Sequence, residues 1–228
     1  MSVRVGPRRQ PAPTDPARAA SPAPYPIFLH LLGRSCLVVG GGPVAEGKVG
    51  GLLEAGARVT IVSPTITDRL RAWIGEGRCR HLVREYRSSD VRGRTLVLVA
   101  TGDARLAARV HKDARRARVL VNAADDLEHC DFFLPAVLRR GRLVVAVSTG
   151  GASPTLARVV RDELEPLVPE SYGLLLDVVA AVRARARQGP APIPAERWRG
   201  VIDARLRALV AEGQVDEARA LLWERLAG

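Results

Sequence analysis

Three consecutive glycines at 40–42 separate an apolar run from a helical pattern, and this arrangement suits the binding of phosphate. The first amides of a helix have no intrahelical partner and the helix dipole is positive there, so anions bind at this end. Glycine also lets a pyrophosphate approach a backbone that a side chain would block. The spacing G-x-G-x-x-A, which ends at Ala45, is that of a dinucleotide-binding loop. We therefore expect Gly40, Gly42, Pro43 and Val44 to bind a dinucleotide.

The elements around this loop form the unit that such a site requires. They are a buried strand at 35–39, a helix at 44–55 and a second strand at 58–62. Together they make a βαβ unit of about 30 residues, although a Gly-rich turn in an ordinary α/β protein is the alternative. The second strand ends at Ser63, Pro64 and Thr65 instead of the acidic residue that usually binds the adenosine ribose. Hydroxyl or backbone groups must bind the ribose here, which leaves NAD and NADP both open.

Helical and extended patterns continue to alternate after this unit. We expect a helix at 67–76, strands at 80–83 and 94–100, a helix through 106–114 and a strand at 118–122. This alternation is typical of a doubly wound α/β fold with a parallel sheet. Ligands of such sheets bind outside the carboxyl ends of the strands, where Thr101 and Asn122 join the glycine loop in one crevice.

A second glycine-bearing loop follows a strand expected at 143–147. Its residues with free hydroxyl or backbone groups are Ser148, Thr149, Gly150, Gly151 and Ser153. Ser153 as N-cap and Pro154 at the first helical position predict a helix with an apolar stripe through Leu156, Val159, Val160 and Leu164. The rest of the chain predicts helices at 172–187, 195–212 and 215–226.

Composition limits the classes of function. The net charge is +11 and Lys48 and Lys112 are the only lysines, so the excess is arginine, which suits carboxylates and phosphates. The arginines form no single tract and aromatic residues are only 4%, which argues against nucleic acid as a partner. Three widely spaced cysteines predict neither disulfides nor a zinc site and favour the cytoplasm. Residues 1–24 read as a disordered extension, and no stretch approaches the ~18 apolar residues of a membrane span.

Seven blocks of sequence together resemble the precorrin-2 dehydrogenase / sirohydrochlorin ferrochelatase family, which occurs alone or as the N-terminal module of siroheme synthase. The blocks are YPIFL at 25–29, GGGPVAEGK at 40–48, VSP at 62–64, AT at 100–101, VNAAD at 121–125, CDFFLPA at 130–136 and VSTGGASP at 147–154. They occur in order between about residue 25 and about residue 187. Seven matched blocks are far more specific than one glycine motif.

The resemblance implies a fold and an activity. The fold would be a Rossmann-like NAD-binding domain at 25–136, a dimerisation segment at 137–165 and a helical C-terminal domain at 166–228, assembled as a homodimer. The activity would be oxidation of precorrin-2 to sirohydrochlorin with NAD as hydride acceptor, and in many members insertion of Fe²⁺, with Co²⁺ as the alternative metal substrate. The family's key aspartate matches Asp125. Its methyltransferase domain has no counterpart in these residues, so another enzyme would supply precorrin-2.

The chemistry of the residues agrees with that activity. Precorrin-2 is a polycarboxylate, so an arginine-rich cleft with the amides and hydroxyls of residues 148–153 would attract it. Its oxidation removes a hydride and a proton, and Asp125 at a strand end can accept the proton. A turn cap is the alternative role for Asp125. His129, Cys130 and Asp131 resemble a metal cluster, but three adjacent side chains cannot all face one ion, so we expect no metal site.

Two other functions are consistent with the sequence. The first is a regulatory Rossmann module that binds NAD without catalysis, although such a module has no reason to carry Asp125 together with the loop at 148–154. The second is a chelatase without dehydrogenase activity, which the intact glycine loop disfavours.

Overall fold

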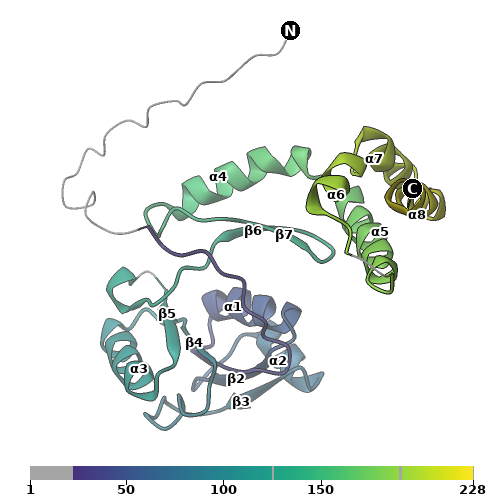
Figure 1. The fold of residues 1–228 in the computed structure, drawn as a ribbon. Coiled ribbons are helices and arrows are strands. Elements are labelled where there is room, and N and C mark those ends of the chain that lie inside the picture. Colours follow the sequence, from purple (N-terminus) through teal and green to yellow (C-terminus); the bar gives the residue numbers. More distant parts are fainter. Residues whose placement is uncertain (1–22, 125, 190–191, 228) are drawn as a thin grey trace, which may run out of the picture. The chain divides into compact units, whose positions relative to one another are not determined.

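The computed structural model describes residues 23–124, 126–189 and 192–227, and it divides the chain into two compact units at Phe132 and Phe133 (Figure 1). Among the described residues, no helix has the length and apolar character that crossing a membrane requires.

The first unit contains a five-stranded, fully parallel sheet in the order β3-β2-β1-β4-β5. Its strands are β1 (Ser35–Val39), β2 (Arg58–Val62), β3 (Cys79–Leu82), β4 (Leu96–Val99) and β5 (Leu120–Ala123). The order reverses at β1, so the crevice at the topological switch point lies between the carboxyl ends of β1 and β4. This arrangement confirms the predicted Rossmann-like sheet.

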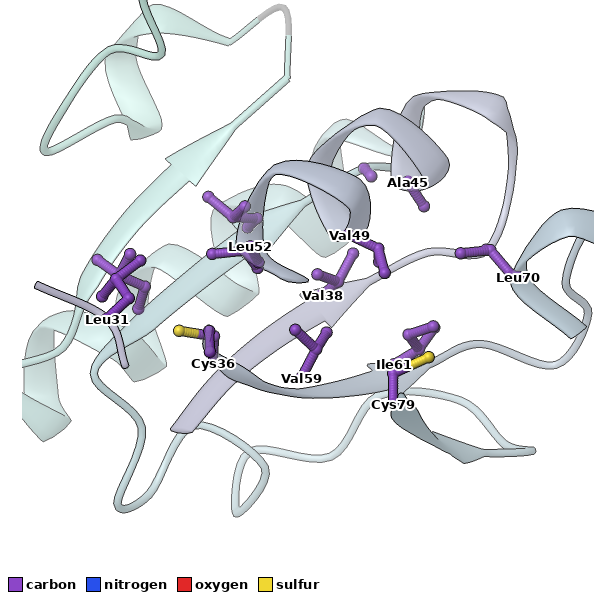
Figure 2. Close-up of a cluster of buried hydrophobic side chains, with 14 residues drawn as sticks. Leu31, Cys36, Val38, Ala45, Val49, Leu52, Val59, Ile61, Leu70 and Cys79 are labelled. Carbon is purple, nitrogen blue, oxygen red and sulfur yellow. The ribbon is translucent and has the colours of Figure 1, made fainter. Parts of the chain in front are cut away.

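Helices cover both faces of this sheet because its strands are apolar on both sides. They are α1 (Pro43–Glu54), α2 (Asp68–Gly75) and α3 (Ala104–Ala117), with a short 3₁₀ turn, η1 (Leu127–His129). In β1, Cys36 and Val38 pack on one face against α1 (Figure 2), whereas Leu37 and Val39 pack on the other face in the cluster that includes α3. Continuous burial of this kind is typical of a parallel strand between two helical layers.

The second unit starts with an antiparallel hairpin and continues as helices. Its elements are β6 (Ala136–Arg140), β7 (Leu143–Val147), α4 (Pro154–Leu164), a 3₁₀ turn η2 (Glu165–Leu167), α5 (Ser171–Ala186), α6 (Ala195–Val201), α7 (Ala204–Ala211) and α8 (Val215–Ala227). The predicted strand at 143–147 pairs with β6, which the sequence pattern did not predict. The core of the unit lies between α5, α7 and α8, around Val178, Leu206 and Leu222.

One helix prediction for the second unit was wrong and another is confirmed. The single helix expected at 195–212 is two helices, because Ile202 has non-helical backbone angles and the side chain of Asp203 accepts from the Leu206 N–H and starts α7. The helix predicted after Ser153 is confirmed as α4, and its apolar stripe is largely exposed within this unit. Leu156 and Val159 are 52% and 46% exposed, and Ala157 is the buried residue of the helix.

Candidate functional site

Two of the three glycines in the predicted phosphate loop are required by the packing of the protein itself. Gly40 has a φ of +117°, and a Cβ there would lie 2.2 Å from the Ala100 carbonyl oxygen. A Cβ at Gly41 would lie 2.0 Å from the Thr65 carbonyl oxygen. The loop is therefore pressed between the ends of β4 and of β2, where no side chain fits.

The third glycine has no such structural reason. Gly42 is the N-cap of α1 with a φ of −86°, and a Cβ built on it meets nothing within 4 Å. Its neighbour Pro43 has no N–H, so the amides of Val44 and Ala45 are the donors of the first turn. No side chain of the described residues caps α1, whereas Thr67 and Asp103 cap α2 and α3. These features fit a bound pyrophosphate that takes the place of a capping side chain.

The loop after β2 is held against the glycine loop. The Thr67 N–H donates to the Gly41 carbonyl oxygen over 3.0 Å, and Nε2 of His81 lies 2.9 Å from the Ser63 carbonyl oxygen. Ser63 is buried, whereas Pro64 and Thr65 are exposed. The loop from Ser63 to Thr65 is therefore anchored by hydrogen bonds and exposes Pro64 and Thr65 to solvent. Binding of the ribose by this loop stays a prediction.

Two further predicted cofactor residues are already bonded within the protein. The Thr101 hydroxyl accepts from the Asp103 N–H at the entry to α3. The Asn122 side chain is buried, accepts from Nζ of Lys48 over 2.9 Å and donates to the Phe132 carbonyl oxygen over 2.9 Å. Sequence reasoning missed Lys48 as a functional candidate, although it is the lysine of the GGGPVAEGK block.

After β5 the chain makes a short loop and passes β5 again at Cys130. The Cys130 side chain bonds to Ala123, the last residue of β5, and to Asp126. Its sulfur accepts from the Ala123 N–H over 3.2 Å and lies 3.2 Å from the carbonyl oxygens of Ala123 and Asp126. Burial raises the pKa of the Cys130 thiol, against the opposing effects of the Ala123 N–H and the charge of Lys48. The thiol therefore keeps its proton at neutral pH and donates a hydrogen bond.

The predicted catalytic residue, Asp125, lies outside the described residues. On one side of it, the Ala124 N–H donates to the Val99 carbonyl oxygen over 3.0 Å. On the other side, Asp126 binds Nδ1 of His129 over 2.6 Å, and the His129 ring meets the His111 ring edge-on. Within the described ranges, no group of three His, Cys, Asp or Glu side chains is arranged to hold a metal ion.

The predicted substrate loop belongs to the second unit and forms a closed turn at the start of α4. The Ser148 hydroxyl accepts from the Gly150 N–H, and the Thr149 hydroxyl bonds to both N and O of Ser153 over 3.0 Å. The Ser153 hydroxyl caps α4 by accepting from the Leu156 N–H. Gly150 and Gly151 both have positive φ, 62° and 83°, which makes glycine the favoured residue at each. Substrate binding by this loop stays a prediction.

Comparisons with known proteins give matches in both units of the chain. Residues 27–136 match a family model described as "Putative NAD(P)-binding", and residues 140–166 match one described as "Sirohaem biosynthesis protein central". The siroheme synthase of Nitrosococcus oceani is 40% identical over 205 residues, which are 89% of this chain and 44% of that protein. The siroheme synthase of Photobacterium profundum is 38% identical over 196 residues, 85% of this chain and 42% of that protein. The chain thus spans less than half the length of these relatives.

A solved structure decides the family. "SirC, precorrin-2 dehydrogenase" matches with a TM-score of 0.69 and 30% identity, over 86% of this chain and 98% of that chain. The chain belongs to the precorrin-2 dehydrogenase family. This membership confirms the resemblance based on the seven sequence blocks. A precorrin-2 dehydrogenase fold combines the parallel sheet and the helical C-terminal region found here.

Proposed function

We propose that the protein oxidises precorrin-2 to sirohydrochlorin with NAD as hydride acceptor, as a step of siroheme biosynthesis. The observation that carries the proposal is the open N-terminus of α1 at Gly42 in a chain of the precorrin-2 dehydrogenase family. Glycine there is unexplained by the fold, and a cofactor phosphate explains it.

Different residues of the first unit would bind different parts of the cofactor. The amides of Val44 and Ala45 would hold the pyrophosphate, and the loop from Ser63 to Thr65 would bind the adenosine ribose. When bound, the nicotinamide supplies the hydride acceptor. The substrate loses one hydride and one proton, and we assign the proton to the Asp125 carboxylate. In the second unit, the hydroxyls of Ser148 and Ser153, which accept hydrogen bonds from backbone N–H groups, would donate to carboxylates of the tetrapyrrole.

A turnover assay tests the dehydrogenase. The full chain is incubated with precorrin-2 and NAD without oxygen, and the absorbance of sirohydrochlorin is followed together with NADH. We expect equal amounts of the two products, and Asp125→Asn should lower kcat by about 10² or more with little change in the Kd for NADH. Binding of NADH without any turnover of precorrin-2 would support the regulatory module instead. A parallel assay with NADP tests the preference for NAD.

Insertion of iron is a second proposed activity, favoured by the siroheme synthases among the relatives. Fe²⁺ would enter the sirohydrochlorin macrocycle as two pyrrole protons leave, and the Asp125 carboxylate would accept them one at a time, passing the first to water before it takes the second. Adding Fe²⁺, or Co²⁺ in a parallel sample, after the oxidation is complete tests this step. The rate must exceed that of a sample without protein.

We also propose that the protein is a cytoplasmic homodimer. Leu156 and Val159 on α4 lie in the predicted dimerisation segment at 137–165 and are half exposed, so a second copy could cover them. Sedimentation should show a dimer for the wild type and a monomer for Val159→Asp. The matched control is Thr155→Asp on the same helix, at an exposed polar position, which should remain dimeric.

A further inference from the structure

Lys48 and Asn122 are 74 positions apart in the sequence, yet Nζ of Lys48 donates to Oδ1 of Asn122 over 2.9 Å. Lys48 lies in the second turn of α1, and Asn122 lies in β5, close to the loop that carries Asp125. We propose that Lys48 and Asn122 act together as positioning residues for this loop. The proposal rests on the dehydrogenase function proposed above.

The charge of Lys48 sets the orientation of the Asn122 amide. An ammonium group can only donate hydrogen bonds, so it must face the amide oxygen and not the amide nitrogen. The nitrogen, Nδ2, is thereby turned toward the Phe132 carbonyl oxygen at 2.9 Å and the Cys130 sulfur at 3.4 Å. Asn122 is only 7% exposed, so an amide turned the other way would leave buried groups without partners.

Asn122 bonds to Cys130 and Phe132, which lie where the chain passes β5 again after the loop. Asp131 pairs with Val121 twice, because its N–H donates to the Val121 carbonyl oxygen over 2.8 Å and its carboxylate accepts from the Val121 N–H over 3.0 Å. With the bonds of Cys130 to Ala123, these contacts form a closure that joins residues 130 and 131 to Val121 and Ala123 of β5. Asn122 adds a side-chain bond across the same closure.

Lys48 connects this closure to the helix that would bind the cofactor. The first turn of α1 offers the amides for the pyrophosphate, and the second turn carries the ammonium that orients Asn122. The hydrogen bond from Lys48 to Asn122 therefore connects α1 to the end of β5, shortly before Asp125 in the sequence. Losing it would misplace the base relative to the hydride acceptor, which lowers the rate of the chemical step more than it weakens cofactor binding.

Steady-state kinetics of four variants in the full chain test the proposal. Lys48→Met removes the charge and the donor at similar length, and Asn122→Leu removes the amide. Lys48→Arg keeps a cationic donor. Lys112→Met is the matched control, since Lys112 is the other lysine of the chain and is exposed on α3. We expect kcat to fall about tenfold in Lys48→Met and in Asn122→Leu, with the Kd for NADH within about twofold of wild type.

The combination of variants distinguishes positioning from simple packing. The double variant Lys48→Met with Asn122→Leu should lose no more than about the larger single effect, because the two side chains act as one unit. Lys48→Arg should keep most of the activity, and Lys112→Met should equal the wild type. A loss in Lys48→Met that appears only in the Kd for NADH would overturn the proposal and make Lys48 a cofactor-binding residue.

Hydrogen–deuterium exchange gives a readout that does not need turnover. Peptides covering residues 121–132 should exchange faster in Lys48→Met than in the wild type and in Lys112→Met, because the closure of the loop is weakened. If wild type fails to oxidise precorrin-2, the proposed function fails and exchange alone decides the positioning role. Exchange and kcat both unchanged in Lys48→Met would exclude that role.

Discussion

Individual glycines of the loop at 40–42 have different physical reasons to be glycine. Gly40 and Gly41 avoid backbone carbonyl oxygens of Ala100 and Thr65, whereas Gly42 faces open space at the N-terminus of α1. A motif describes the three as one feature. The structure separates the two positions that the fold requires from Gly42, for which we propose a role in binding the cofactor phosphate.

Alanine substitutions at Gly40 and Gly42 should therefore act on different properties. Gly40→Ala should destabilise the first unit by about 2 kcal/mol or more, because it combines a positive φ with a clash against the backbone. Gly42→Ala should leave the free energy of unfolding within about 0.5 kcal/mol of wild type and weaken NADH binding about tenfold or more. Urea titration and fluorescence titration with NADH measure the two effects. Equal loss of stability in both variants would contradict this separation.

Asp90 makes the stability of the first unit depend on pH. It is buried and accepts two hydrogen bonds from the Arg84 guanidinium, at 2.7 and 2.8 Å, and one from the Arg87 N–H. The hydrogen bonds from Arg84 are the largest cause that holds the pKa of Asp90 below its ordinary value, and burial opposes them. Since the folded state lowers this pKa, the stabilisation is fully present above the unfolded-state pKa and is lost as pH falls through the folded-state pKa.

Asp90→Asn should thus cost about 2 kcal/mol of unfolding free energy at neutral pH. The difference in unfolding free energy between Asp90→Asn and wild type should shrink as the pH falls from the ordinary pKa of an aspartate toward the lowered pKa of Asp90. Urea unfolding at a series of pH values measures it. Asp68→Asn is the control, because Asp68 also bonds to an arginine, Arg71, over 2.7 Å but its side chain is 97% exposed. Its effect should be negligible at every pH.

At the scale of elements, the second unit depends on a buried arginine that joins the hairpin to the helices. Arg140 in β6 donates to the Val168 carbonyl oxygen over 2.8 Å and pairs with Glu165 and Glu170. The hairpin has only two strands, and such a ribbon is marginally stable by itself. These bonds from β6 to η2 and to the residue before α5 supply support that a two-stranded sheet lacks.

Arg140→Met should destabilise the second unit by about 2 kcal/mol, because it leaves the Val168 carbonyl oxygen without its side-chain donor, whereas the two glutamate partners are exposed to water. The matched control, Arg142→Met, lies in the same hairpin and removes an exposed pair with Asp177, which should cost less than about 0.5 kcal/mol. Thermal unfolding followed by circular dichroism compares the two. Similar losses of stability in both variants would contradict a special contribution of the buried Arg140 side chain.

For the whole molecule, the net charge of +11 predicts how the proposed substrate, precorrin-2, would approach the protein. A polycarboxylate is attracted to a positive protein over a Debye length, and salt screens that attraction. We expect kcat/KM for precorrin-2 to fall about tenfold between low ionic strength and well above the physiological value, while kcat at saturation changes little. A series of initial rates at increasing potassium chloride measures this. A fall in kcat with constant KM would point to an effect on the chemical step instead.

The sequence alone determined the features that depend on neighbours in the chain. Alternating apolar runs and helical patterns predicted the parallel sheet and its helices, and the glycine spacing predicted the phosphate loop, because periodicity and conformational freedom are local properties. The tertiary structure decided what depends on residues far apart. The different surroundings of Gly40 and Gly42 and the bond between Lys48 and Asn122 both arise from contacts across the fold. Local patterns carry no record of such contacts, since each is created only when the sheet and helices pack together.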